Sequence, residues 1–154
     1  MAKKEFESVG SVPIPAEWDV FASRKSVIYP VKKEYIKRIF DGSKAYEFRK
    51  AFCKEEISSI LLYESRGRGM VVGECQITGK ICCTPSKMWE QCEDYAGITE
   101  KDFFDYFKGC SKACAYVLGD VNIFLEPKPL SYYGIEHVPQ NYVYYTKNEK
   151  SENE

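Results

Sequence analysis

The chain has 154 residues, of which 44% are hydrophobic and 29% charged, and its formal net charge is −1. This length suits a single core of about 100–200 residues, and the composition excludes a largely disordered chain. No apolar run reaches the ~18–20 residues of a membrane span and the first ten residues lack a signal-peptide core, so we expect a cytoplasmic protein with no membrane partner.

The seven cysteines and the single histidine limit the metal and redox chemistry. An odd number of cysteines without a secretion signal favours free, mostly buried thiols over a disulfide framework. A zinc site needs four converging ligands, and His137 is the only histidine that could support one. We therefore expect neither a metal nor another cofactor.

The charges are unevenly distributed along the chain. Residues 24–54 hold ten Lys/Arg against three Asp/Glu, whereas residues 90–105 hold six acids and one base. One end of the molecule could therefore carry a local positive field, although the same pattern suits the solvent faces of helices.

The first half of the chain predicts a lead-in followed by a strand, a helix and a second strand. Residues 1–24 show no clear period and are expected to be an extended lead-in, and residues 25–29 form a strand. Pro30 is expected to open a helix with an apolar stripe at helical spacing, which ends at Gly42. Residues 44–49 then alternate in polarity, as a strand does.

The second half predicts further strands around one helix. Residues 57–63 and 69–77 are expected to be strands joined by the glycine-rich turn "ESRGRG". An irregular stretch with Pro85 and Trp89 precedes an amphipathic helix over 98–109, followed by one or two strands in 113–127. A last strand is expected in 137–145, before the disordered polar tail 147–154.

This order, without a regular βαβ repeat, predicts an α+β domain over residues 25–146. Its sheet is expected to curl into a small barrel with two main helices packed against it.

The segment "DGSKAYEFRK" (41–50) carries the pattern Gly-x-Lys-x-x-Glu-x-Arg at Gly42, Lys44, Glu47 and Arg49. With "LLYESRGRGMVVGECQI", "GITEKDFFDYFKG" and "VPQNYVYY" in the same order, the chain resembles the ASCH family of PUA-like β-barrels over about residues 25–145. The resemblance implies a barrel with a cleft that binds RNA or a modified nucleoside, and a role in RNA metabolism or regulation.

The charged segment suits nucleic-acid binding. Lys44, Arg49 and Lys50 would contact phosphates, Tyr46 would stack on an unpaired base, and Glu47 would accept hydrogen bonds from a base edge. In the alternative interpretation, Glu47 and Arg49 pair with each other while Tyr46 fills the core.

The turn between the two central strands is a second candidate. Arg66 and Arg68 lie on this glycine-rich turn, where they could clamp a phosphate or stack on a base. An exposed hairpin that carries arginine for solubility is the alternative.

An enzymatic interpretation follows from one ASCH branch, which hydrolyses the amide of acetylated cytidine. In the present chain, Lys44 takes the place of that branch's lysine, and Glu47 takes the place of its threonine. The glutamate of that branch would correspond to a residue near Glu93 or Asp94. A catalytic lysine needs a lowered pKa, which a close carboxylate opposes.

A nuclease is a further alternative, with Lys44, Glu47 and Arg49 as acid/base and phosphate clamp and His137 as the single histidine. We expect a binding domain rather than an enzyme. The third class of function is a protein-interaction module, with the "YVYY" edge or the acidic helix as its interface.

Overall fold

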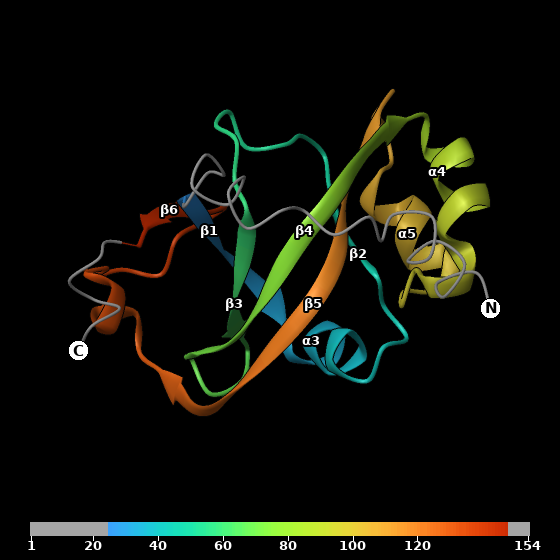
Figure 1. Cartoon of the computed structure of the whole chain (residues 1–154). Helices are drawn as coiled ribbons and strands as arrows, with labels where there is room; N and C mark the ends of the chain where they lie inside the picture. Colours follow the sequence, from blue (N-terminus) through green and yellow to red (C-terminus); the bar gives the residue numbers. More distant parts are fainter. Residues whose placement is uncertain (1–24, 148–154) are drawn as a thin grey trace, which may run out of the picture.

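The computed structural model describes residues 25–147 and shows one curled six-stranded sheet in the order β2-β5-β4-β3-β1-β6 (Figure 1). The elements in chain order are β1 (Lys25–Lys32), α3 (Lys33–Phe40), β2 (Tyr46–Arg49), β3 (Ser59–Ser65), β4 (Val71–Cys83), α4 (Pro85–Cys92), the 3-10 helix η1 (Glu93–Tyr95), α5 (Glu100–Tyr106), β5 (Ala113–Lys128), the 3-10 helix η2 (Leu130–Tyr133) and β6 (Val143–Thr146). The expected lead-in 1–24 and all but the first residue of the expected tail lie outside the described residues.

The sheet curls because its longest strands are bulged. β1 runs parallel to β3, and the other neighbouring strands are antiparallel. The pairing of β4 with β5 shifts register between Val71 and Gly73, between Cys75 and Ile77, and between Ile77 and Gly79. Bulges bend a strand and increase its twist, so the sheet closes around one face as a half-barrel. The expected α+β fold with a curled sheet is confirmed.

Two hydrophobic clusters hold the helices in place. The main core lies inside the curl and includes Tyr29, Ile36, Leu62 and Tyr116. A second cluster joins β2 and β5 to α4 and α5 at the far end of the sheet (Figure 1). There the Phe103 ring packs against Phe48, Trp89 and Phe107 at centroid distances of 4.9–5.1 Å.

Pro30 lies inside β1, and the prediction that it opens the helix is wrong. It pairs with Tyr63 of β3, while β6 pairs only with residues 25–28 of β1. The Pro30 carbonyl accepts a hydrogen bond from Arg49. The N–H and C=O groups of one strand residue point in the same direction. The carbonyl of Pro30 points to the side on which no strand pairs with it, so proline lacks its N–H on that side and no hydrogen bond of the sheet is lost.

The stretch with Pro85 and Trp89 is the helix α4, which the sequence interpretation left irregular. Thr84 caps it by accepting a hydrogen bond from Lys87 N at 3.3 Å, and Pro85 occupies the first turn. Proline needs no N–H partner at that position, so Thr-Pro was a helix-start signal. The sheet is therefore covered by three α-helices within residues 25–147, where two main helices were expected.

The last part of the chain also differs in detail. Residues 113–128 form one continuous strand, and β6 is confined to four residues. No helix in the described range is both long and apolar enough to span a membrane.

Candidate functional site

A cavity of about 530 Å³, here called the site cavity, lies where β1, α3, β2 and α5 meet. The lining includes three polar residues from one segment of six residues: Lys44, Glu47 and Arg49. The structure thus brings together the three polar residues of the Gly-x-Lys-x-x-Glu-x-Arg pattern.

A bend after α3 makes this convergence possible. Gly42 has a φ of 87°, in the left-handed region, and β2 begins only at Tyr46. Lys44 N donates to Arg38 O at 2.9 Å, so the chain folds back on the last turn of the helix. In a regular strand, Lys44 and Glu47 would face opposite sides. The irregular residues 43–45 allow both side chains to reach one cavity.

Lys44 is a buried cation that is hydrogen-bonded to the loop before α5. The residue is only 5% exposed, and its Nζ donates a hydrogen bond to Ala96 O at 2.8 Å. Nζ also lies 4.7 Å from the centre of the Phe48 ring and 5.3 Å from that of Tyr35. Burial lowers the pKa of Lys44 from 10.5 to about 8, although Glu47 acts in the opposite direction. The loss of hydration therefore outweighs the carboxylate that was expected to keep this pKa high.

The loop between η1 and α5 is tied to the bend by three consecutive carbonyls. The bonds are Ala45 N to Tyr95 O (2.9 Å), Lys44 Nζ to Ala96 O (2.8 Å) and Arg38 Nη1 to Gly97 O (2.9 Å). Gly97, with a φ of 63°, packs directly on Lys44: a Cβ there would lie 2.4 Å from Lys44 Cβ. This loop fixes both the lysine and the start of α5.

Glu47 and Arg49 form an ion pair in the wall of the site cavity. Glu47 is 6% exposed, and its Oε1 lies 3.2 Å from both Nε and Nη2 of Arg49. The guanidinium carbon lies 3.8 Å from the centre of the Tyr29 ring, and Nη2 also donates to Pro30 O at 3.4 Å. The pairing considered as an alternative is therefore present, and both partners still face the cavity.

The other predicted residues lie elsewhere. Tyr46 stacks on Phe48 at 5.9 Å on the side of the second cluster, where burial and the Cys92 thiol raise its pKa to about 12. Lys50 is exposed at the rim, with Nζ 5.1 Å from the centre of the Tyr106 ring. The exposed Arg66 and Arg68 occupy the β3–β4 turn and do not line the site cavity.

The sequence interpretation did not identify the wall of the site cavity that α5 forms. Asp102, Asp105 and Tyr106 line the site cavity, and their spacing of three and four places them on one helix face. That spacing was the available signal, but it does not show which way the face points. Glu93 and Asp94, the acids suggested by the resemblance, do not line the cavity.

The cavity wall carries charges of both signs. The cations are Lys32, Lys44 and Arg49, and the acids are Glu34, Glu47, Asp102 and Asp105. Such a wall suits a ligand that both donates and accepts hydrogen bonds, as a nucleobase does, better than a bare polyanion.

The described residues offer little for metal or histidine chemistry. Within residues 25–147, no group of three or more His, Cys, Asp or Glu side chains is arranged to hold a metal ion. His137 is exposed and does not line the site cavity. Proton transfer in that cavity would therefore use its own lysine and carboxylates.

Comparison with known proteins identifies related chains and folds. Residues 24–144 match the family model described as Domain of unknown function (DUF365). An ASCH domain-containing ribonuclease from Zymomonas mobilis is 29% identical over 98 residues, which are 63% of this chain and 66% of that protein, just under two thirds of its length.

Crystal structures of ASCH from Zymomonas mobilis and of two of its variants have the same fold. Their TM-scores are 0.72 and 0.73 at 24% identity, and the superpositions cover 84–85% of this chain and 93–96% of theirs. The curled sheet with its helices is thus shared with ASCH proteins over most of both chains.

Substitution of Gly97 by alanine will displace Lys44. Gly97 and Gly109 both have positive φ (63° and 81°), but a Cβ at Gly109 would meet nothing within 4 Å. Left-handed strain costs about 1–2 kcal/mol at either position. We expect Gly97→Ala to lower the free energy of unfolding by about 1–3 kcal/mol more than Gly109→Ala, measured by urea denaturation. Equal losses would contradict the packing of Gly97 on the lysine.

The depressed pKa of Lys44 predicts a pH-dependent stability. The folded pKa is about 8 against 10.5 for an ordinary lysine, so the unfolded chain holds this proton more tightly. The free energy of unfolding should therefore rise by about 3 kcal/mol between pH 8 and 10.5 from this group. Lys44→Met removes that rise, whereas the tyrosines titrate in both proteins. Parallel pH profiles for the two proteins would show that the lysine is not depressed.

Proposed function

Because this chain belongs to the family described as Domain of unknown function (DUF365) and has an ASCH-type domain, we propose that it binds RNA, with one unpaired nucleotide in the site cavity. The observation that carries the proposal is the convergence of Lys44, Glu47 and Arg49 in a single cavity. The relative described as a ribonuclease supports RNA as the ligand class.

The cavity groups have complementary roles in this proposal. Glu47, oriented by Arg49, accepts hydrogen bonds from an exocyclic amine or a ring N–H of the base. The Lys44 ammonium donates to a base carbonyl or a ribose oxygen. Tyr106, 39% exposed at the cavity wall, takes the stacking role first assigned to Tyr46, because Tyr46 packs on the other side.

The size of the cavity supports one nucleotide rather than a duplex. About 530 Å³ falls in the usual range of small-ligand sites, ~300–1,000 Å³. The flanking phosphates would lie outside it, near the exposed Lys32 and Lys50. Arg66 and Arg68 would contact RNA only if the strand continued to the β3–β4 turn.

Fluorescence anisotropy with a labelled single-stranded RNA of about ten nucleotides tests this proposal. We expect binding that weakens roughly sevenfold between 50 and 200 mM salt, as two phosphate contacts, at Lys32 and Lys50, would give for a single strand. Glu47→Gln and Arg49→Ala should each weaken binding at least tenfold, because both alter the base-reading pair.

The control is Lys87→Ala, which removes an exposed positive charge on α4 away from the site cavity. Circular dichroism must first show that each variant is folded, because removal of one partner of a buried pair can cost 3–5 kcal/mol. If Lys87→Ala and folded Glu47→Gln weaken binding equally, the cavity does not read the base.

Cleavage of the bound RNA is the second candidate function, and one observation favours it. A lysine with a pKa of about 8 can exchange a proton near neutral pH, as a general acid or base must. Glu47 stands within the same wall. The amide hydrolysis of acetylcytidine is the less favoured enzymatic reaction, because a glutamate occupies the place of that branch's threonine.

Lys44→Arg separates binding from cleavage, because arginine keeps the charge but does not release its proton. We expect the unaltered protein to cleave end-labelled RNA at a rate that changes with pH around 8. Lys44→Arg should retain binding within about threefold and lose cleavage at least a hundredfold. A variant that cleaves normally would exclude Lys44 from the chemistry, and release of acetate from acetylcytidine would favour the amidohydrolase.

A further inference from the structure

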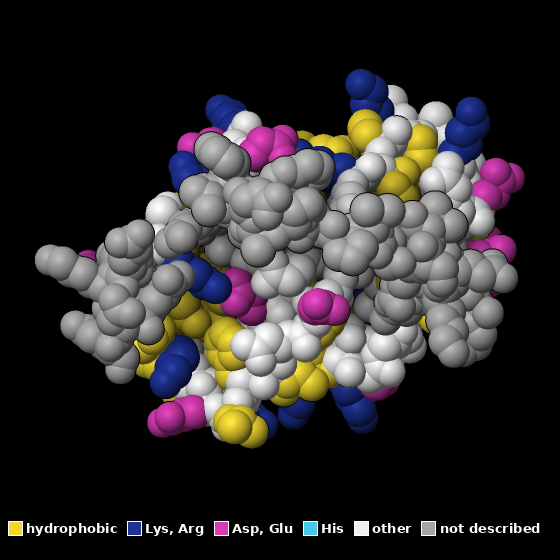
Figure 2. Space-filling model, viewed as in Figure 1, with side chains coloured by type: hydrophobic (Ala, Val, Ile, Leu, Met, Phe, Trp, Pro, Cys, Tyr) yellow, Lys and Arg dark blue, Asp and Glu magenta, His cyan; other side chains and the backbone are white. Residues whose placement is uncertain are grey.

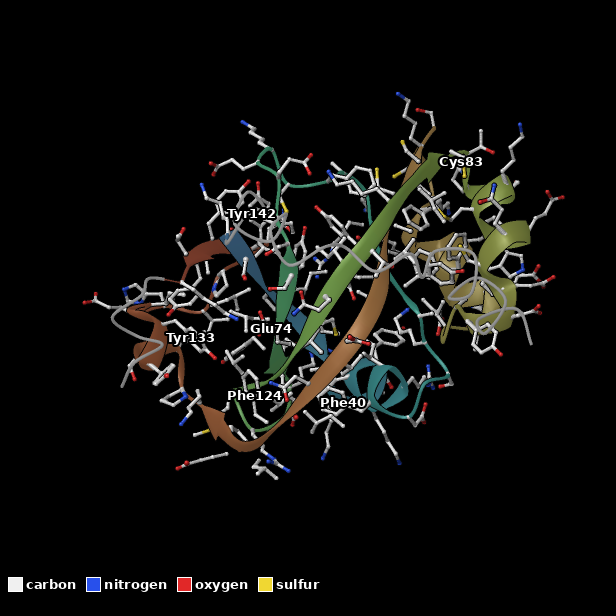
Figure 3. The ribbon with its side chains drawn as sticks, in the orientation of Figure 1. Phe40, Glu74, Cys83, Phe124, Tyr133 and Tyr142 are labelled. Carbon is white, nitrogen blue, oxygen red and sulfur yellow. The ribbon has the colours of Figure 1, made fainter. Side chains whose placement is uncertain are left out.

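A second cavity of about 510 Å³ lies on the other face of the sheet and shares no lining residue with the site cavity. Its wall includes Leu61, Glu74, Tyr133, Tyr145 and Lys147. Figure 3 shows Glu74, Phe124 and Tyr133 on the side of the central strands toward the C-terminal segment. Figure 2 shows hydrophobic side chains beside basic and acidic ones over the outer half of β5, on this part of the surface. We call it the outer cavity.

Strand alternation directs Glu74 into the outer cavity. Glu74 pairs with Leu61 across β3 and β4, and Cys75 pairs with Ile60. Ile60 and Cys75 belong to the main core, whereas Leu61 belongs to the cluster under the C-terminal segment. Successive strand residues face opposite sides, so the Glu74 carboxylate points away from the main core.

A chain of buried hydroxyls holds this carboxylate. Ser59 Oγ donates to Glu74 Oε2 at 2.5 Å, and the Oγ atoms of Ser26 and Ser59 are 2.6 Å apart. A serine hydroxyl has one proton, so Ser59 receives its second bond from Ser26. Glu74 is 7% exposed, and its other oxygen, Oε1, contacts the Lys147 ammonium group.

The ammonium group of Lys147, which belongs to the chain itself, occupies the polar end of the outer cavity. Lys147 Nζ donates to Glu74 Oε1 at 3.1 Å, and the Lys147 side chain is 40% exposed. The Tyr133 and Tyr145 rings meet edge to face at 4.9 Å beside it. A carboxylate with aromatic walls attracts a cation both through its charge and through the faces of the rings.

We propose that the outer cavity binds the alkylammonium group of a small molecule, which displaces Lys147 from Glu74. The side chain of Lys147 shows the chemistry that fits: an ammonium on an unbranched carbon chain. Lys147 can withdraw because its side chain is partly in solvent, whereas Glu74 is fixed by Ser59. The cavity volume suits a small ligand. This inference does not depend on RNA binding at the site cavity.

The test uses n-butylammonium, which reproduces the lysine side chain, and n-butanol as its neutral counterpart. Chemical shifts of the Leu61 methyl groups and the Tyr133 ring report binding by NMR. We expect millimolar affinity for n-butylammonium in Lys147→Ala, as suits a ligand of five heavy atoms, and at least tenfold weaker binding in the unaltered protein. n-Butanol should bind Lys147→Ala at least tenfold more weakly than n-butylammonium does.

The matched control is Lys128→Ala, which removes another cation from the wall without touching Glu74. It should leave the affinity within twofold of the unaltered protein. Glu74→Gln combined with Lys147→Ala should abolish binding; if that protein does not fold, the comparisons of the two lysine variants and the two probes decide. Equal binding of both probes, an equal gain in both lysine variants, or no shift at Leu61 and Tyr133 would overturn the proposal.

Discussion

The hydrogen bond from the Lys44 ammonium to the Ala96 carbonyl is the interaction on which the site cavity depends. It joins the bend after α3 to the loop before α5, and the bonds of Ala45 and Arg38 to the two neighbouring carbonyls reinforce it. The lysine thereby becomes buried, and its pKa falls to about 8. Because α5 begins just after this loop, the same contact also places the acidic wall of the cavity opposite β2.

Four buried charged residues, Lys44, Glu47, Glu64 and Glu74, are unusual in so small a domain, and each has a defined partner. Every buried side-chain nitrogen or oxygen atom in residues 25–147 has a hydrogen-bond partner. Apolar residues of similar volume often serve stability as well as a buried ion pair does. Glu64 accepts a hydrogen bond from Arg68 N within the β3–β4 turn. We interpret the other three charges as groups retained for ligand chemistry, Lys44 and Glu47 in the site cavity and Glu74 in the outer cavity.

The single sheet separates the two cavities. Alternation along a strand sends neighbouring side chains to opposite faces, so β3 and β4 supply the main core with one set and the outer cavity with the other. The site cavity forms where α3, β2 and α5 close the curl. The outer cavity forms between the sheet and the segment that leads from β5 to β6 (Figure 1).

The sequence by itself determined the α+β class, most strands and the polar triad, because strand alternation, helical stripes and the Gly-x-Lys-x-x-Glu-x-Arg pattern are local properties. It misassigned Pro30, whose place in β1 depends on where β6 stops, and it left α4 irregular although Thr84 and Pro85 marked its start. Only the tertiary structure decided that Lys44 is buried, that Tyr46 faces the second cluster and that α5 supplies the opposite wall. Those outcomes depend on contacts between segments some fifty residues apart, such as that of Lys44 with Ala96, which no local pattern encodes.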